Sequence, residues 1–220
     1  MKDYAIFYNY HTIGDVLLII SDLETKPNRV IKNGDVTSLY LDDKRWASEG
    51  KTPLFFSKDD KLIGINIFNI SNVLKIKSNG LIVLPLKKMI DVINNILINA
   101  NVETLEYKKE SGFKVGKVLT CEEHPDSDHM HVLTVDIGSE VLDIVCGAPN
   151  VKEGQKVVVA TLGTTMFDGK KIVPSSLRGI KSNGMLCSPR ELHLEGAPNV
   201  RGILVLDDDA IIGEDFFKNN

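Results

Sequence analysis

The second half of the chain is a series of short, valine-rich segments separated by turn residues, and this pattern limits the possible folds more than any other feature. The segments are FKVGKVLTCEE, HVLTVDIG, LDIVCGA, QKVVVATLG and GILVLD, and the turns are HPDSD, GAPN, KEGQ and FDGKK. Valine favours strands, whereas clusters of glycine, proline, asparagine and aspartate favour turns. About five short strands within about 100 residues predict a small closed or partly closed barrel.

The first half predicts a mixed architecture. Apolar runs on either side of Gly14 and an Asn-Gly-Asp turn at 33–35 favour antiparallel strands. Alternating isoleucines at 63–67 predict a half-buried strand. After Pro85 the spacing of apolar residues becomes helical, and the helix is expected to end near Asn101. Its apolar face is expected to contain Leu86, Met89, Ile90, Ile93, Ile96, Leu97 and Ala100.

The size and composition allow two ordinary domains, since the chain has 220 residues, of which 43% are hydrophobic and 25% charged. No apolar run approaches the roughly 20 residues that cross a bilayer, and the N-terminus lacks the apolar region of a signal peptide. We therefore expect a cytoplasmic protein with no membrane partner. The expected divisions are a small α+β N-terminal domain at 1–104 that ends in a helix, a linker at 105–112, an all-β domain at 113–209 and a C-terminal tail at 210–220.

The charge balance differs between the two halves. The formal net charge is -4, and residues 110–220 contain 11 basic and 17 acidic side chains. This balance argues mildly against a polybasic protein that binds nucleic acid non-specifically. Any field that attracts RNA to the second half must come from local clusters of cations.

Cysteines and histidines raise two further hypotheses. Four residues of the types that bind zinc lie close together, but without a second compact pair of ligands; they are Cys121, His124, His129 and His131. Cys146 or Cys187 would act as a nucleophile only beside a base or a cation, which the sequence does not place. No phosphate-binding glycine motif is present. We expect no catalytic residue, no metal and no cofactor.

The stretch SSLRGIKSNGM offers chemistry suited to RNA. Arg178 and Lys181 suit phosphates, and Ser182 and Asn183 suit hydrogen bonds to base edges or sugars. Met185 suits packing against a base. From chemistry alone an equal alternative stands, in which the glycines form turns, the methionine fills the core and the arginine is an ordinary surface charge.

Three motifs in this half occur in the same order as in a known domain family. They are GKVLTCEEHPDSDHMHVLTVDIG, DIVCGAPNVKEGQKVVVATLG and LRGIKSNGMLCSPRELHL, between about residues 113 and 208. Together they resemble the tRNA-binding domain of the bacterial phenylalanyl-tRNA synthetase beta chain, of methionyl-tRNA synthetase appendices and of free-standing tRNA-binding proteins. The whole chain is also similar to small bacterial proteins that join such a domain to an N-terminal extension.

The resemblance implies a five-stranded OB-fold barrel, with a short helix or turn between the third and fourth strands, that binds tRNA without catalysis by shape and backbone contacts. In that family the Ser-x-Gly-Met segment contributes to RNA binding, and here it is Ser182, Gly184 and Met185. Four other positions also match the family motifs: Asn150, Arg178, His124 and Asp128. For Asn150 and Asp128 an alternative role is to hold turns through bonds between the side chain and the backbone.

Two neighbouring positions depart from the family pattern. After His-Pro-x-x-Asp the family usually has lysine or arginine and then leucine, whereas this chain has His129 and Met130. A mostly neutral group replaces a fixed cation, and one lost phosphate contact weakens binding and reduces its salt slope by about one unit. The alternative function is therefore a protein–protein interaction module that has lost most RNA affinity. The resemblance also allows a homodimer and a synthetase or other protein partner.

Overall fold

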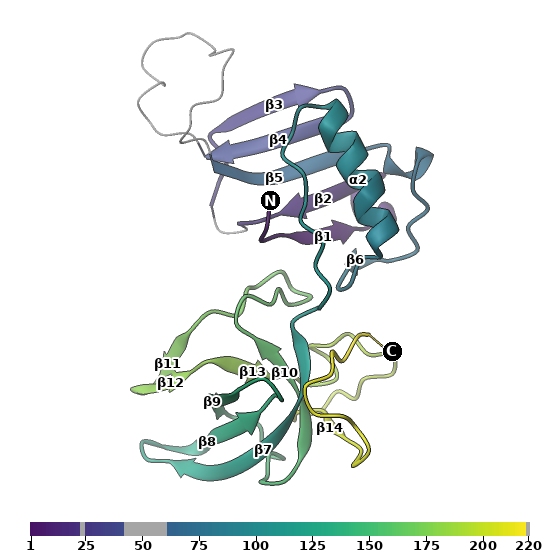
Figure 1. Ribbon diagram of the computed structural model, residues 1–220. Coiled ribbons are helices and arrows are strands. Elements are labelled where there is room, and N and C mark those ends of the chain that lie inside the picture. Colours follow the sequence, from purple (N-terminus) through teal and green to yellow (C-terminus); the bar gives the residue numbers. More distant parts are fainter. Residues whose placement is uncertain (23–24, 42–60, 219–220) are drawn as a thin grey trace. The chain divides into compact units, whose positions relative to one another are not determined.

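The computed structural model describes residues 1–22, 25–41 and 61–218 (Figure 1). The chain divides into two compact units, Met1–Lys108 and Lys109–Asn220. None of the helices in the described ranges is long and apolar enough to cross a membrane.

The first unit is built on an antiparallel sheet with the strand order β3-β4-β5-β2-β1-β6. The turn at Gly34, where φ is 58°, joins β3 to β4 as the Asn-Gly-Asp sequence predicts. Two short helical turns, α1 at Tyr10–Ile13 and η2 at Ile70–Asn72, connect strands. The strands are β1 Ala5–Tyr8, β2 Val16–Ile20, β3 Arg29–Asn33, β4 Val36–Leu41, β5 Lys61–Phe68 and β6 Gly80–Leu81.

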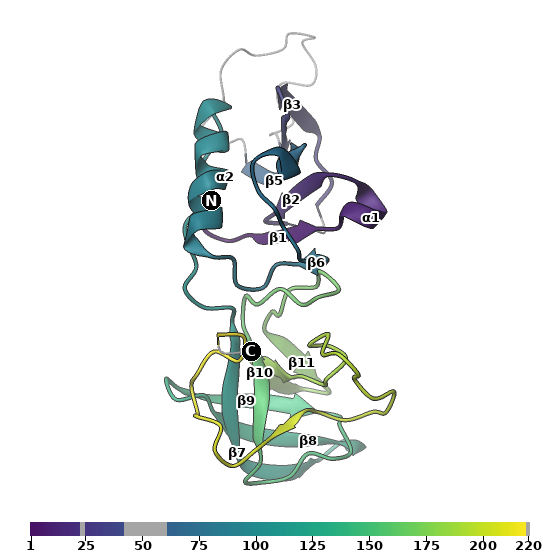
Figure 2. The ribbon, with the colours of Figure 1, turned by 90° about the vertical axis from the view of Figure 1, so that its right-hand side faces the viewer.

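Helix α2, at Lys87–Asn99, covers one face of this sheet (Figure 2). Its buried residues Ile90, Ile93 and Leu97 belong to the same core cluster as the sheet residues Ile6, Leu17, Ile19 and Ile65. The helical spacing of apolar residues is confirmed, but the expected place of Leu86 on the buried face is wrong. Leu86 precedes the first helical residue and is 75% exposed, because the helix begins one residue later than the apolar pattern.

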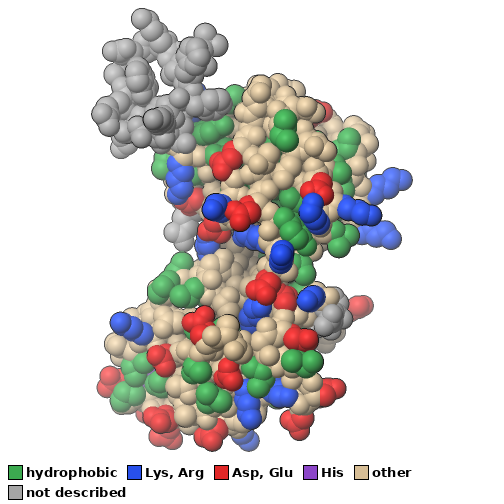
Figure 3. Space-filling model, viewed as in Figure 1, with side chains coloured by type: hydrophobic (Ala, Val, Ile, Leu, Met, Phe, Trp, Pro, Cys, Tyr) green, Lys and Arg blue, Asp and Glu red, His purple; other side chains and the backbone are tan. Residues whose placement is uncertain are grey.

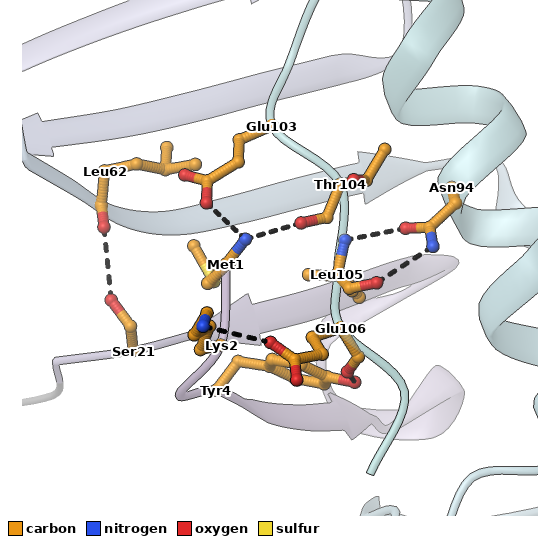
Figure 4. Close-up of polar contacts among 10 residues, drawn as sticks. All are labelled: Met1, Lys2, Tyr4, Ser21, Leu62, Asn94, Glu103, Thr104, Leu105 and Glu106. Carbon is orange, nitrogen blue, oxygen red and sulfur yellow. Dashed lines mark hydrogen bonds and ion pairs between the residues drawn. The ribbon is translucent and has the colours of Figure 1, made fainter.

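The segment after α2 packs back onto the first unit (Figure 4). The Asn94 side chain accepts a bond from the Leu105 N–H at 2.7 Å and donates to the Leu105 carbonyl at 3.0 Å. The Tyr4 hydroxyl donates to the Glu106 carbonyl at 2.6 Å, and burial together with the Glu106 carboxylate raises the pKa of Tyr4 to about 12. Residues 105 and 106, expected in the linker, therefore contribute to the first unit, since Leu105 is part of its core.

Replacing Asn94 by alanine should destabilise the first unit. Asn94→Ala leaves the Leu105 backbone groups without their partners, so the free energy of unfolding should fall by about 1–3 kcal/mol. Urea denaturation followed by the helical circular dichroism signal, to which α2 contributes, measures the change. Asn95→Ala on the exposed next position is the matched control and should cost less than about 0.5 kcal/mol. Equal losses in both variants would contradict this role.

The second unit is mostly β, as the sequence predicts. Its main sheet has the order β13-β10-β7-β8-β9, with β14 also paired to β10, and β11 and β12 form a separate hairpin. Among the described strands, β13 and β9 lie at the two ends of this order and do not pair with each other. The expected closed barrel of five strands is therefore not confirmed. The strands are β7 Phe113–His124, β8 Ser127–Asp136, β9 Val141–Cys146, β10 Lys156–Thr161, β11 Ser175–Leu177, β12 Ile180–Ser182, β13 Gly184–Leu186 and β14 Val205–Leu206.

The core of the second unit comes from the inward positions of these strands. Val118, Leu133, Ile144 and Val159 are fully buried, as alternating apolar residues in a half-exposed sheet should be. The C-terminal segment also packs against β7: the Gly213 N–H donates to the Val115 carbonyl and the Phe216 N–H to the Phe113 carbonyl, each at 2.8 Å. The segment expected as a tail is therefore part of the unit over its described residues.

Candidate nucleic-acid interface

The hairpin of β11 and β12 is fixed to the end of β7. Leu177 pairs with Ile180, and the two residues between them, Arg178 and Gly179, have φ values of 45° and 86°. Two consecutive residues with positive φ form the tight hairpin turn that matches the twist of the strands. The turn directs Arg178 toward the β7–β8 connection, where its guanidinium donates to the Asp126 carbonyl.

The buried side chain of His124 connects this hairpin to the β7–β8 connection. It is 3% exposed, and its Nε2 lies 3.1 Å from the Leu177 carbonyl oxygen. Its Nδ1 accepts a bond from the Asp126 N–H at 3.1 Å. Because a carbonyl only accepts, the proton is on Nε2, and both ring nitrogens are used within the protein. His124 therefore holds the hairpin in place and is not available to a ligand.

Ser182 is also turned inward. It is 2% exposed; its hydroxyl accepts a bond from the Val145 N–H at 3.1 Å and donates to the Gly184 carbonyl at 3.2 Å. The next residue, Asn183, donates its backbone N–H to the Asp143 carbonyl at 2.8 Å. These bonds join the β12–β13 segment to β9. The buried Ser182 hydroxyl therefore holds the β12–β13 segment in place.

Asn150 has a similar supporting position. Its side-chain amide donates to the Ile203 carbonyl at 3.0 Å, and its side-chain oxygen accepts from the Ile203 N–H at 2.9 Å. This geometry agrees with the alternative in which Asn150 holds a turn. Asp128 lies exposed on β8, and Lys181 lies exposed on β12.

A groove of about 870 Å³ opens on the second unit. The ends of β9 and β13 line it, with Val145, Met185 and Leu186. The turn at 166–172 also lines it, and in this turn the Met166 N–H donates to the Lys170 carbonyl at 2.7 Å. The remaining lining comes from the turn at 188–193 and from residues 199–203. This volume is within the range typical of ligand sites.

Four cations line this groove. They are Lys170, Lys171, Arg190 and Arg201, drawn from the 11 basic residues in an acidic half. Arg190 donates to the Asn199 side-chain oxygen at 2.6 Å and Arg201 to the Gly147 carbonyl at 2.8 Å, so both guanidinium groups are held in position. Figure 3 shows acidic and basic side chains scattered over the face of this unit that it presents. Four of the 11 basic residues of this half therefore line one groove.

Two carboxylates also line the groove, and both are bound to neighbouring groups. The Lys170 backbone N–H and ammonium bond to Asp168 and lower the pKa of its carboxyl, so it stays ionised. Glu191 accepts bonds from the Ser188 N–H and hydroxyl at 2.7 and 2.6 Å, which closes the turn carrying Arg190. The groove therefore keeps a formal excess of cations.

Of the residues predicted for RNA binding, only Met185 lines this groove. Arg178 and His124 meet at the β11–β12 hairpin instead, with Asp126 between them. Sequence reasoning did not find the groove cations. The paired lysines at 170 and 171 were a local signal, but they lie in a segment interpreted only as a turn.

The thiols do not support nucleophilic chemistry. Burial raises the pKa of Cys187 to about 12, and burial also raises the pKa of Cys121 and of Cys146. A thiol with a raised pKa has little thiolate at neutral pH and reacts slowly. Within the described ranges, no three histidine, cysteine or acidic side chains are grouped so that they could hold a metal ion.

Comparison with known proteins finds family matches in both halves of the chain. Residues 113–215 match a family profile described as "Putative tRNA binding domain", and residues 52–107 match a domain of unknown function, DUF4479. The beta subunit of phenylalanine–tRNA ligase from Porphyromonas gingivalis is 54% identical over 46% of this chain and 13% of its own length. A MetRS-related protein of known structure from Pyrococcus horikoshii covers 46% of this chain and 84% of its own, with 22% identity and a TM-score of 0.34.

The second unit is thus a domain of the tRNA-binding class by sequence, as the three motifs predicted. A relative matching nearly the whole chain is YtpR of Bacillus subtilis, named a putative tRNA-binding protein. It is 40% identical over 96% of this chain and 98% of its own length. The chain belongs to the YtpR family.

Removing the His124 ring should release the β11–β12 hairpin. His124→Ala deletes the bonds to Leu177 and Asp126, so amide hydrogens in 175–182 should exchange about tenfold faster. Hydrogen–deuterium exchange read by mass spectrometry measures this. His129→Ala, at an exposed position of β8, is the control and should leave the hairpin protected. Unchanged exchange in folded His124→Ala would show that the ring does not hold the hairpin.

Proposed function

We propose that this chain is a noncatalytic tRNA-binding protein whose second unit holds tRNA through contacts to its backbone. The main support is the set of four cations around one groove in a unit that is otherwise acidic. The names of the YtpR relative and of the matching domain point to the same ligand. Phosphate contacts supply most of the sequence-independent affinity for nucleic acids.

We further propose that the second unit is a five-stranded OB-type barrel. The order β13-β10-β7-β8-β9 supplies five neighbouring strands. The Asn183 backbone bond to Asp143 and the Ser182 bond to Val145 connect the two ends of this order. In such barrels, oligonucleotides bind to one strand face and the adjoining loops, which here correspond to the ends of β9 and β13 and the turns that line the groove with them.

The predicted site residues then have two kinds of role. Ser182 and His124, which are buried, and Asn150, which is half-buried, position the loops. Met185 contacts the ligand from the groove lining. The residues that extend the contact surface toward the hairpin are Arg178, Lys181, Asn183 and Asp128.

Neutralising the groove cations should weaken tRNA binding and its dependence on salt. The triple variant Lys170→Ala, Arg190→Ala, Arg201→Ala removes up to three phosphate contacts, so the slope of log affinity against log salt should flatten by about two to three units. Filter binding of bulk tRNA to the full chain at several salt concentrations measures both quantities.

The control for this experiment makes the same change in net charge at positions outside the groove. The triple variant Lys117→Ala, Lys152→Ala, Lys218→Ala removes three cations of the same unit that do not line the groove. It should leave the slope nearly unchanged. Equal effects of the two triple variants would show that only net charge matters, and absence of saturable tRNA binding by the unmodified chain would exclude the proposed function.

Removing the Asp168 charge should strengthen binding. Asp168→Asn keeps a side-chain oxygen to accept the Lys170 N–H bond but deletes a carboxylate that the lowered pKa keeps ionised. Because repulsion of phosphate decreases, tRNA affinity should rise about two- to threefold at low salt and less at high salt. The same titration measures it. A loss of affinity in this variant would place the phosphates away from Asp168.

The acid excess of the second half favours a second candidate, a protein-interaction module with little RNA affinity. Its partner would be a synthetase or another protein, or a second copy of the chain. Pull-down from nuclease-treated lysate separates the two functions, because a partner retained without RNA supports the second. Sedimentation of the purified chain tests the homodimer.

A further inference from the structure

An aromatic pair stands in the wall of the cationic groove. The rings of Phe167 and His193 lie 4.6 Å apart between centroids with an interplanar angle of 12°, a parallel stack. Both residues line the groove. His193 is exposed, whereas Phe167 is half-buried and is backed by Phe113 and Phe217 at 6.3 and 5.9 Å. The pair is therefore a supported flat surface that ends at the groove.

His193 has a strained backbone conformation. Its φ of 52° is in the left-handed region, which residues other than glycine rarely adopt. The turn that fixes it is closed by the Leu192 N–H bond to the Ser188 carbonyl and the His193 N–H bond to the Arg190 carbonyl, at 3.2 and 3.0 Å. Left-handed residues outside glycine concentrate at functional sites. The same turn carries Arg190, so a ring and a cation share one turn.

The groove also has apolar lining residues besides its cations. Met185, Leu186 and Ile203 are among them, and Arg190 and Arg201 line the same groove. A paired RNA helix presents phosphates and sugar edges on its outside and keeps its bases stacked inside, so it would leave the apolar lining without a partner. An unpaired nucleotide presents a phosphate and a free base face together, and bases stack on aromatic side chains beside cationic grooves.

We propose that the groove takes an unpaired segment of RNA, with one base stacked on the His193–Phe167 pair and against Met185, and its phosphates beside Arg190 and Arg201. This inference rests on the proposed tRNA binding and specifies which part of the RNA enters the groove: a loop or a single-stranded end. Because every base has a flat face, the subsite tolerates different bases.

Competition between RNA probes tests the choice of ligand. Labelled bulk tRNA bound to the full chain is titrated with a 12-nucleotide oligo(A), with oligo(U) of the same length, or with a blunt duplex that contains the same number of nucleotides. A strand of about 12 nucleotides is within the length that one OB-type barrel covers, which is about 4–16 nucleotides. Both single strands should displace the tRNA at lower concentration than the duplex. Bound tRNA displaced only by duplex would overturn the inference while leaving the proposed function intact; no binding of tRNA would remove both.

A second variant isolates the stacking surface. His193→Asn removes the ring but suits the left-handed backbone, and it should weaken oligo(A) binding about tenfold while the salt slope stays the same, because stacking releases no counterions. Arg190→Ala should instead flatten the slope by about one unit. A thermal unfolding midpoint equal to that of the unmodified chain shows that His193→Asn is folded. A folded His193→Asn with unchanged oligo(A) affinity would exclude the base site.

Discussion

The connection between the β12–β13 segment and β9 is the constraint on which the arrangement of the second unit depends. The Ser182 hydroxyl bonds to Val145, and the Asn183 N–H bonds to Asp143. These bonds place β13 beside the end of β9, and residues of both strands line the groove. A buried hydroxyl with both functions satisfied is costly to replace, because its partners would lose their bonds inside the protein.

The electrostatics of the groove follow from local backbone geometry and not from composition. The turn at 166–172 and the turn closed by Glu191 each bring cations to the groove wall. Arg190 and Arg201 are held by an amide and a carbonyl, which are neutral, so their charge is not cancelled. A unit with an acidic balance can therefore present a cationic surface to phosphate at one place and repel it elsewhere.

The sequence predicted what depends on local pattern. The α2 period, the turn at Gly34 and the mostly β second unit are confirmed because spacing and turn chemistry determine them. The groove was not predictable, because Lys170 and Arg201 lie 31 positions apart and meet only through the fold. Leu86 was misplaced because an apolar period does not fix a helix end to the residue.

The Ser-x-Gly-Met segment combines a buried residue that holds the strand with a residue that lines the groove. Ser182 is buried and anchors the strand, as its two hydrogen bonds require. At Gly184 a side-chain carbon would lie 3.2 Å from the Ala160 carbonyl oxygen and 3.2 Å from the Ile144 side chain, so a larger residue would push β13 away from β10. Only Met185 reaches the groove. The first two residues therefore fix the position of the third, and under the proposed function a loss of affinity on replacing Ser182 would report displacement of Met185 as much as any contact of its own.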